Sequence, residues 1–354
     1  MGSRPSRQFE VGPVAVGFTV ALVLTIAFSA VLLSGRLSTG SLVWAGPQGP
    51  SYPVAYQDFH GEGAALTTGY DGQQNYAIAV AFPHISEAVP YLYTPHYRLM
   101  RILEPAIASI APRGSPTVLA LLGLNILGAA LAAGALADLA RSAGRPPALG
   151  YAAAVAATPA VLLNTSDALA FGLALVGIAF AVRRQHGWAV LALCLAALTR
   201  ETTVVISGVL GLIEFRRSPR TPRRYLPYAC PGFVVALWFA LLTLVVAPEA
   251  TDSFQVLGIR ELGGGDLLLA LAGIAIGCAG VVAWRRIPQL AAVCAVFTAW
   301  MLVELPVMLT WDATFRVNLP AWAAGLSGVA WWIYARRVGH RPLATGPIVA
   351  PTAA

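Results

Sequence analysis

The sequence predicts an all-α fold, a polytopic α-helical membrane bundle of about ten transmembrane segments. The first observation is composition, since 57% of the 354 residues are hydrophobic, only 11% are charged and the mean hydropathy is +0.70. Such a composition does not describe a water-soluble core. The second observation is a series of apolar runs of membrane-spanning length, and the third is an uneven distribution of arginine between the segments that connect them. We therefore interpret residues 1–354 as a single integral membrane domain.

Six apolar runs have the length of about 20 residues that a spanning helix needs. They lie near 11–33, 116–137, 225–247, 266–284, 289–309 and 317–334. The first run follows Arg4 and Arg7, as a signal peptide would, but it is longer than a typical signal core of about 7–15 residues. We expect it to remain as an anchor.

Between 149 and 214 the apolar runs are shorter. They lie at 149–163, 168–182, 188–198 and 202–213. A helix of about 15 residues rises only about 22 Å, whereas the hydrocarbon core is roughly 30 Å thick. We expect these short helices to surround an outward-facing polar vestibule, because charge at that depth is tolerated only beside protein or water. Local thinning of the bilayer is the alternative.

Arginine supplies all 23 basic residues, and ten segments would gather sixteen of them on one side. These lie in Arg4–Arg7, Arg141–Arg145, Arg183–Arg184, Arg216–Arg224, Arg285–Arg286 and Arg336–Arg341. The positive-inside rule makes that side cytoplasmic, with both termini and the basic loop 215–224. The absence of lysine is typical of a GC-rich bacterial genome, so we expect a bacterial cytoplasmic membrane. No basic domain remains for nucleic acid, and residues 342–354 are expected to form a flexible tail.

Residues 34–115 form a long first extracytoplasmic loop that contains seven of the 11 tyrosines. One helical pattern starts at Asp71 and continues to Phe82, and a second opens at Pro95 and runs to Ile107. We expect both to be amphipathic helices lying on the membrane. The tyrosines could stack on sugar rings, but an interfacial aromatic belt would show the same enrichment.

On the second of these helices, three charged residues recur at every third position. Arg98, Arg101 and Glu104 would therefore share a face, and the two guanidinium groups could bind a phosphate. The alternative is an ion bridge between Arg101 and Glu104 on a solvated face.

A weaker pattern for a metal site occurs near the start of the loop. Asp58, His60 and Glu62 alternate as ligands on an extended strand would. Three polar residues around a glycine are more often a solvated turn, so we predict no metal-binding residue.

A charged turn interrupts the apolar pattern at Thr199-Arg200-Glu201. An unpartnered charge within a membrane is costly. We expect Arg200 and Glu201 to pair with each other, or alternatively with Asp167 or Asp312.

Three motifs follow one another along roughly 70–202. They are Tyr70-Asp71-Gly72-Gln73-Gln74-Asn75-Tyr76, Tyr97-Arg98-x-x-Arg101-Ile102-Leu103-x-Pro105 and Leu198-Thr199-Arg200-Glu201-Thr202. Their succession resembles bacterial polytopic proteins related to the GT-C glycosyltransferase superfamily. Members of that superfamily use polyprenyl-phosphate sugars as donors at the extracytoplasmic face. They carry a long first outer loop with membrane-lying helices and a catalytic aspartate in that loop.

The resemblance implies a role for particular residues. Asp71 would be the catalytic aspartate, and Arg98, Arg101 and Arg200 would bind the donor phosphate. The residues expected to line the cavity are Tyr70, Gln73, Tyr76, Tyr97, Asp167, Glu201, Asp312 and Arg316. Asp71 also stands where a helix cap would, which is the structural alternative.

One departure concerns the residues before the Pro-x-Tyr-Arg unit. Related sequences often carry an acidic residue there, but this stretch reads Tyr93-Thr94-Pro95-His96-Tyr97-Arg98. The resemblance therefore implies no certain cofactor and leaves a divalent cation open.

The resemblance predicts transfer of a sugar from a polyprenyl-phosphate donor to a cell-envelope acceptor, with the lipid-linked sugar and membrane lipids as partners. Two alternatives belong to other classes. Intramembrane charge at Arg200-Glu201 and Glu304 would also suit a secondary transporter. The altered segment before Pro95 suits a catalytically silent GT-C-like protein that binds a lipid-linked glycan. The role of the outer loop at 248–265 stays open.

Overall fold

The computed structural model describes residues 38–62, 69–151, 164–246, 264–304 and 319–338, together with single positions at 19, 23, 153, 157 and 161. Within these ranges every regular element is a helix and none is a strand. The predicted all-α class is therefore confirmed.

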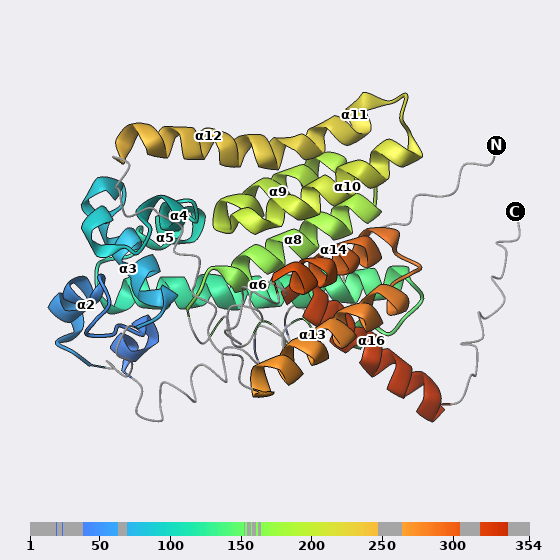
Figure 1. Ribbon diagram of the computed structural model, residues 1–354, viewed down its shortest axis with the longest axis horizontal. Helices are drawn as coiled ribbons and strands as arrows, with labels where there is room; N and C mark the ends of the chain where they lie inside the picture. The colour runs from blue at the N-terminus through green and yellow to red at the C-terminus, as the bar shows by residue number, and fades with distance from the viewer. Residues whose placement is uncertain are drawn as a thin grey trace, which may run out of the picture.

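The helices form two groups (Figure 1). We call the first group the cap, and it comprises η1 (Thr39–Val43), α2 (Tyr52–Phe59), α3 (Asp71–Ala81), η2 (Ile85–Glu87), η3 (Val89–Tyr91), α4 (Pro95–Leu99) and α5 (Leu103–Ala108). The second group is the bundle, with α6 (Ser115–Ser142), η4 (Pro147–Gly150), α8 (Asp167–Val182), α9 (His186–Thr199), η5 (Glu201–Thr203), α10 (Val204–Arg217), α11 (Pro222–Tyr225), η6 (Leu226–Ala229), α12 (Cys230–Val245), α13 (Gly264–Ala283), α14 (Pro288–Glu304) and α16 (Leu319–Val338). The cap lies at the end of the bundle where α6 begins.

Proline marks the first turn of several of these helices. Helices α2, α4, α6, α11 and α12 each carry a proline at their first or second position. A first-turn N–H has no partner within the helix, so proline removes no hydrogen bond there, and its fixed φ suits the helix. The proline residues therefore help to set where these helices begin.

The bundle helices agree with the apolar pattern of the sequence. One helix occupies each of the expected runs at 116–137, 168–182, 188–198, 202–213, 225–247, 266–284, 289–309 and 317–334. The predicted break within 188–213 is confirmed, because α9 ends at Thr199 and α10 begins at Val204. The runs at 11–33 and most of 149–163 lie outside the described residues, as do the tail at 342–354 and most of the 248–265 loop.

Two helices of the described chain are long and apolar enough to cross a membrane, Ser115–Ser142 and Pro222–Val245. Helices α8 and α9 are apolar but shorter. In α6, 67% of the apolar stretch is buried, whereas over Pro222–Val245 only 17% is. Helix α12 therefore presents a large apolar surface, including Phe233 and Leu244, that water would not favour.

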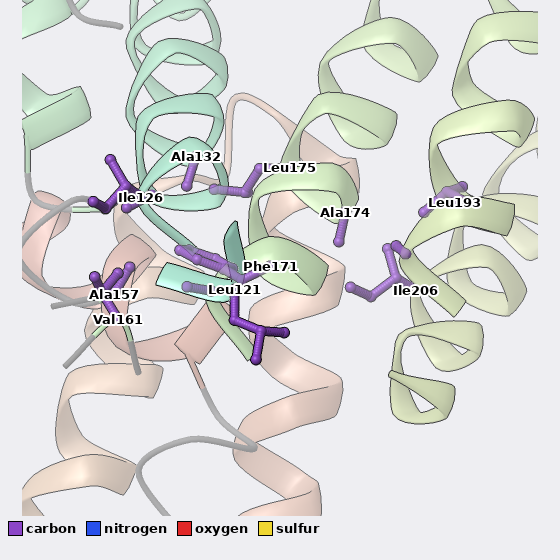
Figure 2. Close-up of a cluster of buried hydrophobic side chains, with 14 of the residues drawn as sticks. Leu121, Ile126, Ala132, Ala157, Val161, Phe171, Ala174, Leu175, Leu193 and Ile206 are labelled. Carbon is purple, nitrogen blue, oxygen red and sulfur yellow. The ribbon is translucent and has the colours of Figure 1, made fainter. Parts of the chain in front are cut away.

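The centre of the bundle depends on close contact between α6 and α8. A Cβ atom added to Gly128 would lie 2.4 Å from the carbonyl oxygen of Ala168, and one added to Gly172 would lie 2.2 Å from that of Gly128. The two backbones therefore meet directly, as small residues allow in helix packing. Larger side chains such as Leu121, Phe171 and Leu175 fill the space around this contact (Figure 2).

The cap differs from the two amphipathic helices expected of it. The residues of α3 from Gly72 to Ala79 are all buried, so this helix is enclosed by protein rather than lying on a membrane. The helix expected from Pro95 to Ile107 is broken between Leu99 and Leu103. Pro105 explains the break, since its ring would clash with the carbonyl of Arg101 in a continuous helix and it has no N–H to donate.

We predict that Gly128→Ala destabilises the protein by about 1–3 kcal/mol, because the added methyl group must push α6 away from α8. Thermal unfolding of the purified protein in detergent measures this. Gly123→Ala is the matched control on the same helix, since nothing lies within 4 Å of a Cβ at that position. Equal stability of the two variants would contradict the close contact.

Candidate functional site

Asp71 is the first residue of α3 and turns its carboxylate toward two arginines of the cap. Its Oδ1 lies 2.8 Å from Nη1 of Arg98, and its Oδ2 lies 3.9 Å from Nη1 of Arg101. The N-cap position belongs to Tyr70, whose side chain makes no capping hydrogen bond. Asp71 is therefore the first helical residue rather than the N-cap, and its negative charge is also favoured by the dipole of α3.

Arg101 is the centre of the cluster, and its side chain is only 4% exposed. Its Nε and Nη2 donate to the two carboxylate oxygens of Glu201 at 3.3 and 3.4 Å. Nη2 also donates to the hydroxyl of Tyr97, and the Tyr97 ring centroid lies 4.4 Å from the guanidinium carbon. We call Asp71, Tyr97, Arg98, Arg101 and Glu201 the arginine site.

The electrostatics of the arginine site keep its central pair charged. Burial works against the charge of Arg101, but Glu201, Tyr97 and Asp71 outweigh it and raise the pKa of the guanidinium. Burial likewise opposes ionisation of Glu201, but Arg101 and Arg200 outweigh it and lower the pKa of that carboxyl. The charge of Arg101 therefore stabilises the ionised form of Glu201, and the charge of Glu201 stabilises that of Arg101, in a site with little water.

Arg200 and Glu201 are consecutive residues with different partners. Arg200 forms an ion pair with Asp167 at the start of α8, and both side chains are buried. Glu201 pairs with Arg101 instead. The expectation that Arg200 and Glu201 pair with each other is therefore wrong, whereas the alternative partner Asp167 is confirmed. Arg200 has an extended backbone, which directs successive side chains to opposite sides.

Three carboxylates and three guanidinium groups meet at this end of the bundle. They belong to Asp71, Asp167 and Glu201, and to Arg98, Arg101 and Arg200. The formal charges balance without a ligand. An arriving anion must therefore compete with a carboxylate for its arginine.

Two residues expected to line the cavity, Gln73 and Tyr76, make contacts away from the arginine site. Gln73 is buried and accepts a hydrogen bond from the backbone N–H of Gly46. Tyr76 is buried and donates its hydroxyl proton to Asp58 at 2.6 Å. Both follow Asp71 at helical spacings that direct them away from the arginine site, so they hold the cap together. Tyr70 donates its backbone N–H to Trp44, and Asp312 and Arg316 lie outside the described residues.

Arg98, Arg101 and Glu104 do not share a face, because the break at Arg101 separates α4 from α5. Glu104 is fully buried, and its Oε1 accepts a hydrogen bond of 2.6 Å from Nδ2 of Asn125 on α6. The Arg101–Glu104 ion bridge is therefore wrong. Sequence reasoning also missed Asn125, although a lone amide within an apolar run of α6 is a recognisable signal of a buried polar contact.

The described residues contain no group of three or more histidine, cysteine, aspartate or glutamate side chains that could hold a metal ion. Asp58, which the sequence grouped with His60 and Glu62, accepts hydrogen bonds from Arg113 at 2.8 and 2.9 Å. Asp58 therefore pairs with Arg113 in the structure.

Comparison with protein-family models, with curated proteins and with solved structures finds no match for this chain.

We predict strong coupling between Arg200 and Asp167, because removal of Arg200 takes away the guanidinium group that forms an ion pair with this buried carboxylate. Arg200→Ala alone should cost about 3–5 kcal/mol, and the double change with Asp167→Ala should recover part of that loss. Thermal unfolding of the four proteins of this double-mutant cycle measures the coupling. A larger coupling energy in the equivalent cycle of Arg200 with Glu201 would contradict the pairing.

Proposed function

We propose that this protein is a GT-C-like integral membrane glycosyltransferase. It transfers a sugar from a polyprenyl-phosphate donor to a cell-envelope acceptor at the extracytoplasmic face of the bacterial cytoplasmic membrane. The observation that carries the proposal is the carboxylate of Asp71 between the guanidinium groups of Arg98 and Arg101. The candidate general base, Asp71, and the two candidate phosphate ligands, Arg98 and Arg101, belong to separate sequence motifs but lie together.

The position of the arginine site agrees with this orientation. At the far end of α6, Arg183 pairs with Asp138, and Arg145 donates to the carbonyl of Ala283. That end also carries the basic last turn of α10, with Arg216 and Arg217. The 28 residues of α6 rise about 42 Å between the two ends. If the end of the bundle that carries Arg145, Arg183 and Arg216 is cytoplasmic, the arginine site at the opposite end faces outward.

The proposed reaction exchanges one bond at the anomeric carbon of the sugar. The acceptor hydroxyl oxygen forms a bond to that carbon, and the bond from the carbon to the donor phosphate oxygen breaks. Asp71 takes the proton of the acceptor hydroxyl as general base. Arg98 and Arg101 stabilise the negative charge on the departing polyprenyl phosphate, for which a guanidinium fork is well suited.

The ion pairs of the ligand-free site couple donor binding to activation of the base. Arg98 is the more exposed of the two arginines, whereas Tyr97 covers Arg101. A donor phosphate reaches Arg98 first and competes with Asp71 for its guanidinium. Asp71 is then released from its closest partner and can accept a proton. Arg200 stays beneath the site, where it supports the charge of Glu201.

We predict that Asp71→Asn lowers sugar transfer by about 10²–10⁴-fold at an unchanged protein level, because asparagine keeps the side-chain volume but cannot accept the proton. Transfer from a radiolabelled polyprenyl-phosphate sugar in membranes measures this. Asp58→Asn is the matched control, since that carboxylate also pairs with an arginine, Arg113, at 2.8 Å but lies outside the arginine site. Full activity of Asp71→Asn would eliminate the catalytic role, and binding of the donor without transfer by the parent protein would favour a silent binder.

The proposed topology makes a separate prediction. Reporters fused after Arg184 and after Arg224 should both be cytoplasmic, and one fused at Arg113 should be external. Arg184 and Arg224 lie at the end of the bundle opposite to the start of α6, which Arg113 precedes. Enzymatic reporters active on only one side of the membrane measure this. An external reporter at Arg224 would contradict the ten-segment arrangement.

A further inference from the structure

Glu104 is a fully buried acidic residue that the proposed reaction does not use. It lies in the first turn of α5, and its Oε1 accepts a hydrogen bond from Nδ2 of Asn125 at 2.6 Å. Asn125 is also fully buried, and its Nδ2 lies 3.4 Å from Oδ1 of Asn164 in the turn before α8. No arginine forms an ion pair with Glu104 in the described part of the chain.

Two atoms of this contact lack the partner that a buried polar atom requires. Oε2 of Glu104 and Oδ1 of Asn125 are both buried, and neither has a hydrogen bond within the part of the chain that the structure describes. If Glu104 is ionised, both atoms are acceptors and neither can satisfy the other. Buried polar groups left in this condition are costly, and they are rare in native structures.

We propose that Glu104 carries a proton in the native protein and forms a paired, two-bond contact with Asn125. Oε2–H of the neutral carboxyl donates to Oδ1 of the amide, while Nδ2–H of the amide donates to Oε1 of the carboxyl. One proton thus satisfies both unpartnered atoms. Glu104 is then a positioning residue for the arginine site, and it acts through α5 rather than by touching a substrate.

The surroundings of Glu104 favour its neutral form. Burial raises the pKa of Glu104 to about 8, and the hydrogen bond from Asn125 only partly opposes this effect. The titratable and charged groups on α5 and on the elements packed against it, α3, α6 and α9, together with the adjoining Arg101, are Asp71, Tyr76, Arg101, Asp138, Arg141, His186 and Cys194. None of them makes an ion pair or hydrogen bond with Glu104, so no cation among the described residues compensates an ionised form.

The pair lies where the cap meets the bundle. Arg101 stands three residues before Glu104, at the break that precedes α5. Asn164, next to Asn125, accepts a hydrogen bond through its backbone oxygen from Nδ2 of Asn75 on α3. The protonated pair therefore fixes α5 against α6 and holds Arg101 opposite Glu201. Only this positioning role rests on the proposed function, since the protonated pair stands on its own geometry.

Two substitutions of Glu104 distinguish a hydrogen-bonding role of its proton from simple filling of space by its side chain. In Glu104→Gln the amide N–H replaces the acid O–H, so the two-bond contact with Asn125 is kept without a titratable group. In Glu104→Leu the volume is similar but both hydrogen bonds are lost. Near pH 5 we expect the Gln variant to unfold at about the wild-type temperature and the Leu variant to unfold at a lower one.

The pH dependence has a defined sign. Because the folded pKa of about 8 exceeds the ordinary value of 4.5, the stability contributed by Glu104 is complete below about pH 4.5 and is lost as pH rises toward 8. The Gln variant lacks this loss. Its unfolding temperature should therefore exceed that of the wild type at pH 9 although the two agree near pH 5, and agreement at every pH from 5 to 9 would overturn the proposal.

Infrared spectroscopy in an ester-free detergent observes the proton directly. The wild type at pH 6 should show a carbonyl band of a protonated carboxylic acid that is absent from Glu104→Gln, and absence of this difference would overturn the proposal. In the transfer assay Glu104→Gln should match wild-type kcat and KM at pH 6, and Glu104→Leu should lose transfer. If the band and the stability profile appear but no protein transfers sugar, the protonated pair is supported and the glycosyltransferase function fails.

Discussion

The buried guanidinium of Arg101 is the constraint on which the rest of the site depends. A charge that is only 4% exposed is tolerated when paired, and loss of one partner of such a pair costs about 3–5 kcal/mol. Its partners come from α3, from α4 and from the turn between α9 and α10. The break at Arg101, which Pro105 enforces, frees this side chain to reach Glu201. The same ion pair therefore joins the cap to the bundle and assembles the site.

Beneath this ion pair, the helices are held together by contacts of different kinds. Close backbone contact at Gly128 and Gly172 joins α6 to α8, and the Arg200–Asp167 pair ties the α9–α10 turn to the start of α8. The hydrogen bond from Asn125 to Glu104 joins α6 to α5. In the proposed function, rigid support of this kind would let the more exposed Asp71 and Arg98 respond to a ligand while Arg101 stays fixed.

The bundle was predictable from the sequence because apolar runs and arginine clusters are local signals, and the break at Arg200 follows from both. The cap was harder to predict, since helical periodicity at Asp71 and Pro95 reports where a helix begins but not what covers it. Spacing grouped Arg101 with Glu104, whereas the structure pairs Arg101 with a residue one hundred positions later. A lone amide such as Asn125 in an apolar run signals a buried polar contact, but its partner Glu104 belongs to another helix and no local pattern identifies it.

The most direct test of the arginine site is binding of polyprenyl phosphate without a sugar to the purified protein. If the phosphate competes with Asp71 for Arg98 and Arg101, Asp71→Asn should bind it several-fold more tightly than the wild type, although its sugar transfer should be much slower. Asp58→Asn should bind as the wild type does, because its arginine partner is Arg113. Equal or weaker binding by Asp71→Asn would contradict the competition and, with it, the proposed role of the site.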